Sequence, residues 1–193
     1  MAAAGTRSHN LNYWDLQLVK FAQDEVLEQK SLENKVDLMW QCILTALFPI
    51  EEGYVVVVRD RVAHQQPADA ADIMVKHLRP DKTLPIIFTM EDKRAEKQVK
   101  KKDWDEATAQ LERYFAIERQ SETGEGAAKT LYGAVAIGMR VEFWEHRTAG
   151  RRGKRQMQSQ GLYHVVRKKE KIQNYLRRIK DKEEQISAEL SVE

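Results

Sequence analysis

The fold is decided by the stretch Pro85-Ile86-Ile87-Phe88-Thr89-Met90-Glu91-Asp92-Lys93, in which an apolar run ends in a cluster of charged residues. β-Branched and aromatic residues favour extended structure, so we predict a strand over residues 85–91. Residues two apart on a strand point to the same face, so Glu91 and Lys93 are expected to project together. Such a pair can simply solvate the strand end. Alternatively, the carboxylate binds a metal ion beside a cation that orients a water molecule or offsets developing charge.

Asp72 is the carboxylate that we expect to join Glu91. It opens a short strand 19 residues before Glu91, and a hairpin of that length can place the two side by side. Two carboxylates can share a hard cation such as Mg²⁺ or Mn²⁺, and the main-chain carbonyl of Asp92 can add a ligand. Asp60 and Asp69 compete with Asp72 for this acidic role.

The remaining elements follow from hydrophobic periodicity and from helix and turn signals. We predict a ragged helix over 14–27, a clearer helix from the N-cap Ser31 to Pro49, strands over 54–58 and 72–75, a helix over 103–119, hairpin strands over 131–137 and 140–146, a flexible basic loop over 147–160, a last strand over 162–166 and a long charged helix over 167–190. The buried face of the clearer helix is expected to carry Leu32, Val36, Met39, Ile43 and Leu47. This order predicts a mixed α/β layer fold rather than a regular βαβ alternation.

Asp72 followed by eighteen residues and then Glu91-Asp92-Lys93 resembles the signature of the PD-(D/E)XK nuclease superfamily. The helix segment Gln110-Leu111-Glu112-Arg113-Tyr114 resembles the Q-x-x-x-Y motif of its RecB-like branch. The strand pair after that helix is also similar, so the resemblance covers roughly residues 31–145. It implies a restriction-endonuclease-like fold, in which a mixed β-sheet core is flanked by helices.

The resemblance also implies roles for individual side chains. Asp72, Glu91 and Asp92 would bind the metal ion, and Lys93 would position the attacking water or offset charge. Gln110 and Tyr114 share a helix face because they are four residues apart, and they would orient the substrate. The alternatives are a core role for Tyr114 and a surface role for Gln110. Glu33 would reach the metal site, or it would serve only as a favourable negative charge in the first turn of its helix.

Basic residues are segregated in the chain despite a net charge of only +2. Residues 147–182 hold 13 Lys or Arg and two acids, a charge of +11, which leaves −9 for the rest of the chain. This asymmetry suits a surface that binds a polyanion, although a solvated helix would look the same. The nucleic-acid-binding candidates are Lys100, Lys101, Lys102, Arg151, Arg152, Lys154, Arg155, Lys168 and Lys169.

Length and composition set the remaining expectations. We expect a disordered tail over residues 1–10, one α/β domain over 11–166, and a charged helix over 167–193 packed on or extending from it. The single cysteine, Cys42, cannot form an internal disulfide, and the apolar runs are too short to span a membrane. We therefore expect an intracellular protein of the cytoplasm or nucleus. Its expected function is metal-dependent cleavage of DNA or RNA; the alternative is a catalytically inactive binding or interaction module on the same fold.

Overall fold

A six-stranded mixed sheet forms the centre of the protein in the computed structural model, with its strands in the order β1-β2-β3-β4-β5-β6. The structure describes residues 12–28, 32–58, 71–97, 99–121, 130–149 and 154–191. The strands are β1 (Tyr54–Val58), β2 (Ile73–His77), β3 (Ile86–Lys93), β4 (Leu131–Ile137), β5 (Arg140–Ala149) and β6 (Lys154–His164). The α-helices are α1 (Gln17–Glu28), α2 (Glu33–Leu47), α3 (Lys101–Ser121) and α4 (Lys169–Leu190), with short 3₁₀ turns at Tyr13–Asp15, Ile50–Glu52 and Ala95–Lys97.

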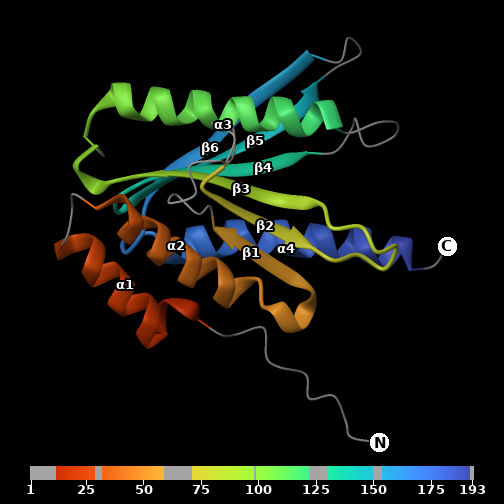
Figure 1. Ribbon diagram of the computed structural model, residues 1–193, viewed down its shortest axis with the longest axis horizontal. Helices are drawn as coiled ribbons and strands as arrows, with labels where there is room; N and C mark the ends of the chain where they lie inside the picture. The colour runs from red at the N-terminus through yellow and green to blue at the C-terminus, as the bar shows by residue number, and fades with distance from the viewer. Residues whose placement is uncertain are drawn as a thin grey trace, which may run out of the picture.

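β3 and β4 are the parallel pair of the sheet, and every other neighbouring pair is antiparallel. A parallel pair needs a crossover connection, and here α3 supplies it. Helix α3 lies over one face of the sheet, while α1 and α2 lie below the other (Figure 1). The predicted α/β class with a mixed sheet is therefore confirmed.

Two apolar cores lie on the two faces of the sheet. The larger core joins α1, α2 and α4 to one face, through residues such as Trp40, Phe88 and Phe143. The smaller core joins α3 to the other face, through residues such as Leu111 and Val135. The alternation along β4 explains this division, since Ala134 and Ala136 belong to the larger core and Val135 and Ile137 to the smaller.

Gly133 lets α3 approach the sheet closely. A Cβ atom built on Gly133 would lie 2.7 Å from Phe115 Cζ, 2.9 Å from Leu111 Cδ1 and 2.9 Å from the Thr89 carbonyl oxygen. These separations are too short for a side chain at this position unless the neighbouring atoms shift. The glycine therefore permits the close packing of α3 on β3 and β4.

Helix α4 packs against the sheet rather than extending from it. Its side chains Ile172, Tyr175, Leu176 and Ile179 are buried in the larger core. The carboxylate of Glu183, only 3% exposed, accepts hydrogen bonds from Arg79 Nε at 2.7 Å and Nη2 at 2.9 Å. Because breaking a buried ion pair strands a charge, this contact ties α4 firmly to the residues after β2.

A second buried carboxylate anchors the same helix to β5. Glu145, fully buried, pairs with Arg178 of α4 at 2.5 Å and also with Arg147.

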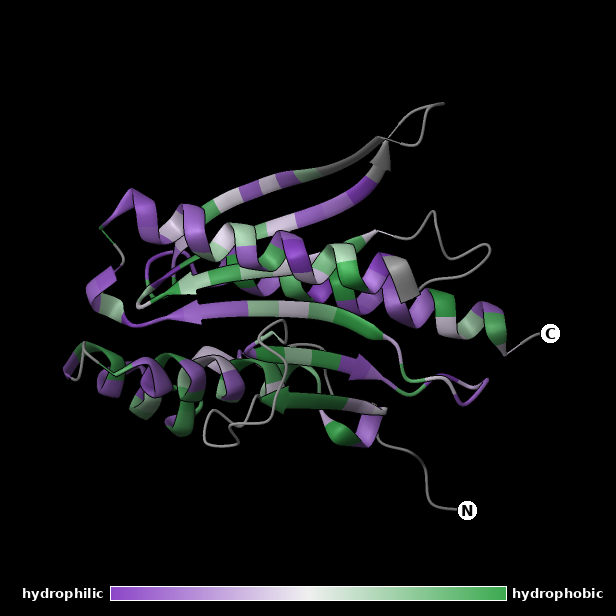
Figure 2. Ribbon diagram, turned by 45° about the horizontal axis from the view of Figure 1, so that its top comes forward, coloured by the Kyte–Doolittle hydropathy of each residue, from purple (hydrophilic) through white to green (hydrophobic). Residues whose placement is uncertain are grey.

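The hydropathy of the strands changes across the sheet, with apolar residues along β1 and β2 and polar ones along much of β5 and β6 (Figure 2). Among the described residues, no helix is both long and apolar enough to cross a bilayer.

Several predicted boundaries were wrong. The predicted flexible basic loop over 147–160 is largely strand, because β5 continues to Ala149 and β6 begins at Lys154. β6 accordingly ends at His164 rather than covering the predicted strand over 162–166. Polar strands of this kind carry no apolar alternation, and their pairing with each other is what orders them.

The start of α2 also differs from the prediction. The helix begins at Glu33, with Leu32 as N-cap and no side-chain cap hydrogen bond, while Ser31 lies outside the described residues. Leu32 is 42% exposed, so it does not belong to the buried face, whereas Val36, Met39, Ile43 and Leu47 do. The predicted tail over 1–10 also lies outside the described residues.

Replacing Leu176 with alanine should test how much α4 contributes to stability. Leu176 is fully buried, so Leu176→Ala should lower the free energy of unfolding by about 2–5 kcal/mol. The matched control Leu162→Ala truncates a leucine that is 50% exposed on β6, and it should change the value by about 0.5 kcal/mol or less. Urea denaturation of both variants measures this, and equal effects would contradict the packing of α4 described above.

Candidate active site

The register of β2 and β3 places Asp72 beside Glu91. Ile73 pairs with Met90 in this antiparallel ladder, so the residues next to them, Asp72 and Glu91, lie opposite each other. The main-chain N–H of Asp92 donates a hydrogen bond of 3.0 Å to Asp72 Oδ2, which fixes that carboxylate. Asp72 is 5% exposed and Glu91 is 1% exposed. The hairpin predicted from the sequence thus brings the two carboxylates together.

Glu91 and Lys93 point to the face of the sheet that α3 covers. Their partners on β4 are Val135 and Ile137, which belong to the core beneath α3, and paired residues share a face. Lys93 Nζ donates to Glu91 Oε1. Tyr114 of α3 donates its hydroxyl hydrogen to Glu91 Oε2 at 3.0 Å. Both oxygens of Glu91 are therefore held in place by the chain itself.

Glu33 and Tyr114 also contact the cluster. Glu33 Oε1, from the first turn of α2, lies 3.7 Å from Lys93 Nζ. Tyr114 is 8% exposed and belongs to the core beneath α3, as the structural alternative for it predicted, and its hydroxyl also binds Glu91. Four segments distant in the chain thus meet at the end of β3.

Gln110 and Asp92 occupy different places in this arrangement. Gln110 lies one turn before Tyr114 on α3, and within the described residues its buried Oε1 has no hydrogen-bond partner. Asp92 is fully buried and follows Glu91 on the strand, so its side chain points to the opposite face. Of the predicted metal ligands, Asp92 can therefore contribute only its main chain.

Burial and neighbouring charges shift the pKa values of the central pair. Burial, followed by the Asp72 carboxylate, raises the pKa of Glu91 to about 7, against the opposing effects of Lys93 and Tyr114. Burial disfavours the charged form of Lys93, but Glu91, Asp72 and Glu33 outweigh it and raise the pKa of this ammonium group. Lys93 is therefore a fixed cation, and Asp72 and Glu91 repel each other across a short distance.

The acidic pair suits a divalent cation. Carboxylate oxygens are the ligands that Mg²⁺ and Mn²⁺ prefer, and a cation between Asp72 and Glu91 would relieve the repulsion that raises the pKa of Glu91. Among the described residues, no group of three or more His, Cys, Asp or Glu side chains could hold a metal ion. Two carboxylates are nevertheless sufficient, since Mg²⁺ is commonly held by one or two carboxylates together with waters and substrate phosphates.

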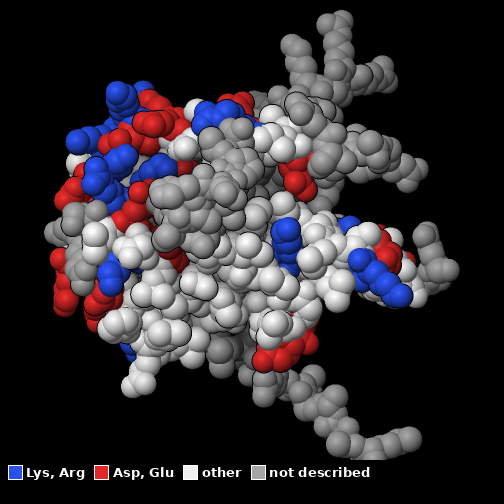
Figure 3. Space-filling model, viewed as in Figure 1, with Lys and Arg blue, Asp and Glu red and all other residues white. Residues whose placement is uncertain are grey.

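The predicted basic residues divide between the two ends of the sheet. Lys100, Lys101 and Lys102 are exposed at the start of α3, where charged side chains gather (Figure 3). Lys168 and Lys169 lie at the start of α4, near the end of β6 that pairs with Arg140. Lys154 and Arg155 begin β6 at the opposite end, and Arg151 and Arg152 lie outside the described residues. The competing acids Asp60 and Asp69 also lie outside them.

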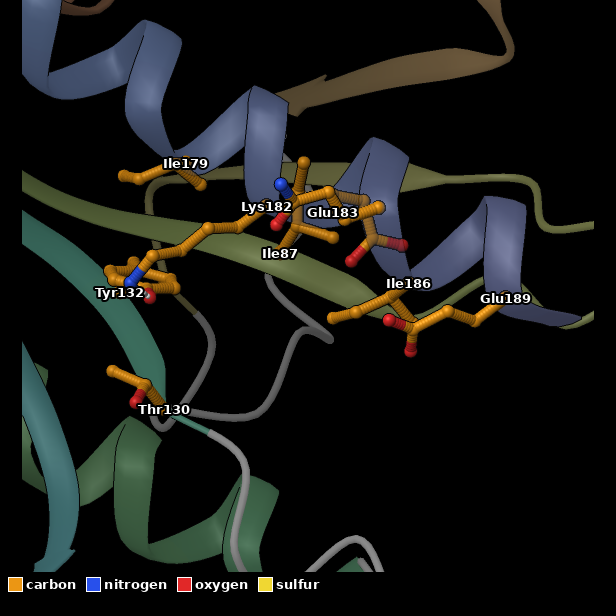
Figure 4. Close-up of a pocket in the computed structure, with 9 residues that line it drawn as sticks. Ile87, Thr130, Tyr132, Ile179, Lys182, Glu183, Ile186 and Glu189 are labelled. Atoms are coloured by element: carbon orange, nitrogen blue, oxygen red, sulfur yellow. Dashed lines mark hydrogen bonds between the residues drawn. The ribbon is translucent and has the colours of Figure 1, made fainter.

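A cavity of about 340 Å³ lies elsewhere, between α4 and the beginnings of β3 and β4. Ile87, Ile179 and Ile186 line it, and Lys182 reaches across to donate a 2.9 Å hydrogen bond to the Tyr132 hydroxyl (Figure 4). Its lining carboxylates include Glu183, which Arg79 already binds, and Glu189. Neither Asp72 nor Glu91 lines the cavity, so it is separate from the acidic pair.

Comparison with protein-family models, curated proteins and solved structures finds no match for this chain. The function must therefore be argued from the geometry of the site.

The raised pKa of Glu91 predicts a pH-dependent stability. In metal-free buffer the folded chain holds this proton up to about pH 7, while an unfolded glutamate releases it near 4.5, so stability falls as pH rises between these values. Glu91→Gln mimics the protonated form. We expect it to match the wild type near pH 4.5 and to exceed its free energy of unfolding by roughly 3 kcal/mol above pH 7.

Urea denaturation in EDTA from pH 4.5 to pH 8 measures this difference. Glu96→Gln, at an exposed glutamate outside the cluster, controls for the loss of one negative charge. A constant difference between Glu91→Gln and wild type across this range would contradict the assignment.

Proposed function

We propose that this protein is a metal-dependent nuclease that hydrolyses phosphodiester bonds through the Asp72, Glu91 and Lys93 site. The observation that carries the proposal is the meeting of two buried carboxylates and a cation at the end of β3. We further propose that the chain is a divergent member of the PD-(D/E)XK superfamily, nearest the RecB-like branch. The mixed sheet flanked by helices supports this, as does the bond from Tyr114 of the Q-x-x-x-Y segment to Glu91.

Each side chain has a defined part in the proposed hydrolysis. Asp72 and Glu91 would hold Mg²⁺ or Mn²⁺, which supplies Lewis-acid polarisation of the phosphate and of a water molecule when bound. The water oxygen forms a new bond to phosphorus and the water gives up a proton to solvent. The P–O bond to the leaving sugar oxygen breaks, and this oxygen takes a proton from solvent to become a hydroxyl group. Because Lys93 stays protonated, it does not remove that proton; it offsets the negative charge that develops on the phosphate oxygens.

The surrounding side chains act as positioning residues. The Tyr114 hydroxyl fixes the orientation of Glu91, and Glu33 helps to hold Lys93 beside it. Gln110 presents a buried amide oxygen one helical turn away, and it is the group that we assign to substrate orientation. Preorganisation of this kind is what electrostatic catalysis requires, since the charges need not rearrange during the reaction.

Cleavage assays test the proposal directly. Purified protein is incubated with labelled single- and double-stranded DNA and RNA in Mg²⁺, in Mn²⁺ or in EDTA. We expect metal-dependent cleavage that falls by at least about 10²-fold in Lys93→Met and in the Glu91→Ala, Lys93→Ala double variant. Glu112→Gln changes an exposed acid on the outer side of α3 and should cleave like the wild type. Cleavage that survives in the double variant would overturn the assignment of the site.

Metal binding gives a readout that does not depend on cleavage. Mn²⁺ or Mg²⁺ bound between Asp72 and Glu91 should raise the melting temperature of the wild type, because a ligand that binds only the folded state stabilises it. Asp72→Asn should abolish this shift, while Glu112→Gln should retain it. A shift of equal size in Asp72→Asn would show that the cation binds elsewhere.

The second candidate function is a nucleic-acid-binding module without catalysis. It is favoured by one observation: both oxygens of Glu91 already bond within the chain, to Lys93 and to Tyr114. In that case the cluster would stabilise the end of β3 and bind no cation. Salt-sensitive binding of nucleic acid, without cleavage and without a metal-induced thermal shift, would establish this function in place of the first.

A further inference from the structure

The order of the strands gathers cations beside the acidic pair. Lys93 on β3 pairs with Ile137 on β4, Ile137 pairs with Arg140 on β5, and Arg140 pairs with His164 on β6. These residues therefore form one row across the edge of the sheet where β3 ends. The main-chain N–H of Gly138 donates to the Lys93 carbonyl at 3.1 Å and closes this edge.

The row presents its side chains on the same face as Glu91. Directly paired residues point to the same side of a sheet, so Lys93, Arg140 and His164 all project to the side that α3 covers. At a strand separation of about 4.8 Å, Arg140 lies roughly 10 Å and His164 roughly 14 Å from Lys93 along the row. Arg140 is exposed, and His164 is half-buried.

Arg167 and Lys168 extend the row beyond β6. Both are exposed in the turn before α4, and the N–H of Lys168 donates to the His164 carbonyl at 2.9 Å. Burial, and after it the charges of Arg167 and Arg140, lowers the pKa of His164. Both of these neighbouring charges are positive, so the imidazole lies in a cationic environment.

Three other arginines of the fold bind buried carboxylates, and the cations of the row do not. Arg79 binds Glu183, and Arg147 and Arg178 bind Glu145. Within the described part of the chain, Arg140, Arg167 and Lys168 take part in no ion pair. Unpaired cations close together repel one another, and a chain of phosphates would neutralise them.

We infer that Arg140, His164, Arg167 and Lys168 form a track that binds the sugar-phosphate backbone of a nucleic acid strand, leading to the site at Glu91 and Lys93. The track rests on the proposed function for the position of the scissile phosphate. It replaces Lys154 and Arg155 as binding residues, because they lie ten and nine residues away along β6, roughly 33 and 30 Å from His164.

The test is salt-dependent binding measured without cleavage. Fluorescence anisotropy of a labelled single-stranded DNA oligonucleotide is recorded in EDTA at several salt concentrations for the wild type and two triple variants. Arg140→Ala, Arg167→Ala, Lys168→Ala removes the track. Lys20→Ala, Lys82→Asn, Arg113→Ala removes three exposed cations that lie outside the site and the track, and asparagine suits the positive φ of residue 82. Melting temperatures confirm that both variants fold.

The track variant should bind at least about tenfold more weakly than the wild type at moderate salt. Its slope of log Kd against log salt concentration should fall by about 2, since three cations would each lose a phosphate contact. The control variant should stay close to the wild type. Equal losses in both variants, an unchanged track variant, or a wild type that does not bind would each overturn the track.

Cleavage by the same proteins in Mg²⁺ separates this inference from the proposed function. If the wild type binds through the track but does not cleave, the nuclease proposal is overturned and the track is supported. If the wild type cleaves and the track variant binds like the wild type, the track is overturned and the nuclease proposal is supported.

Discussion

The parallel pairing of β3 with β4 is the constraint on which the rest of the structure depends. Antiparallel neighbours need only a short turn. A parallel pair instead requires the chain to return from the end of β3 to the level at which β3 begins, and α3 makes that return. This crossover lays α3 over the face to which Glu91 and Lys93 point. It also turns the end of β3 toward the same edge as the start of β5 and the end of β6. A single pairing therefore supplies Tyr114 to the acidic pair and aligns Arg140 and His164 beside it.

Tight packing on one face and buried ion pairs on the other keep this arrangement rigid. Beneath α3, Gly133 permits a contact so close that the helix has little freedom to shift. On the opposite face, Glu145 and Glu183 bind arginines that join α4 to the sheet at two separate points. Separating either pair would leave a buried charge without a partner, so each pair opposes displacement of α4. Glu91 thus lies on a strand that is clamped from both sides.

Local sequence patterns predicted those parts of the fold that depend on local physics. The apolar runs at β1 and β4 correctly predicted strands, and the four-residue spacing of Gln110 and Tyr114 fits helix α3. The separation of Asp72 from Glu91 was enough to predict that the two carboxylates meet. The long β5–β6 hairpin was missed because its outer half is polar and is ordered by pairing alone. The cationic row was missed for a related reason. Nothing near Arg140 or His164 in the chain distinguishes them, and only the order of the strands brings them to Lys93.

The crossover also determines when during folding the acidic pair can take its final form. Residues 94–130 separate β3 from β4, so joining these strands means closing a long loop, with an entropic cost that local contacts do not offset. Glu33, Asp72, Glu91 and Tyr114 likewise come from distant segments. Chains dominated by such non-local contacts fold slowly. The β2–β3 hairpin can form early, but the bond from Tyr114 to Glu91 must wait until α3 has docked. The carboxylates consequently acquire their hydroxyl partner only when α3 has docked, and a chain in which α3 is not yet docked does not carry the finished site.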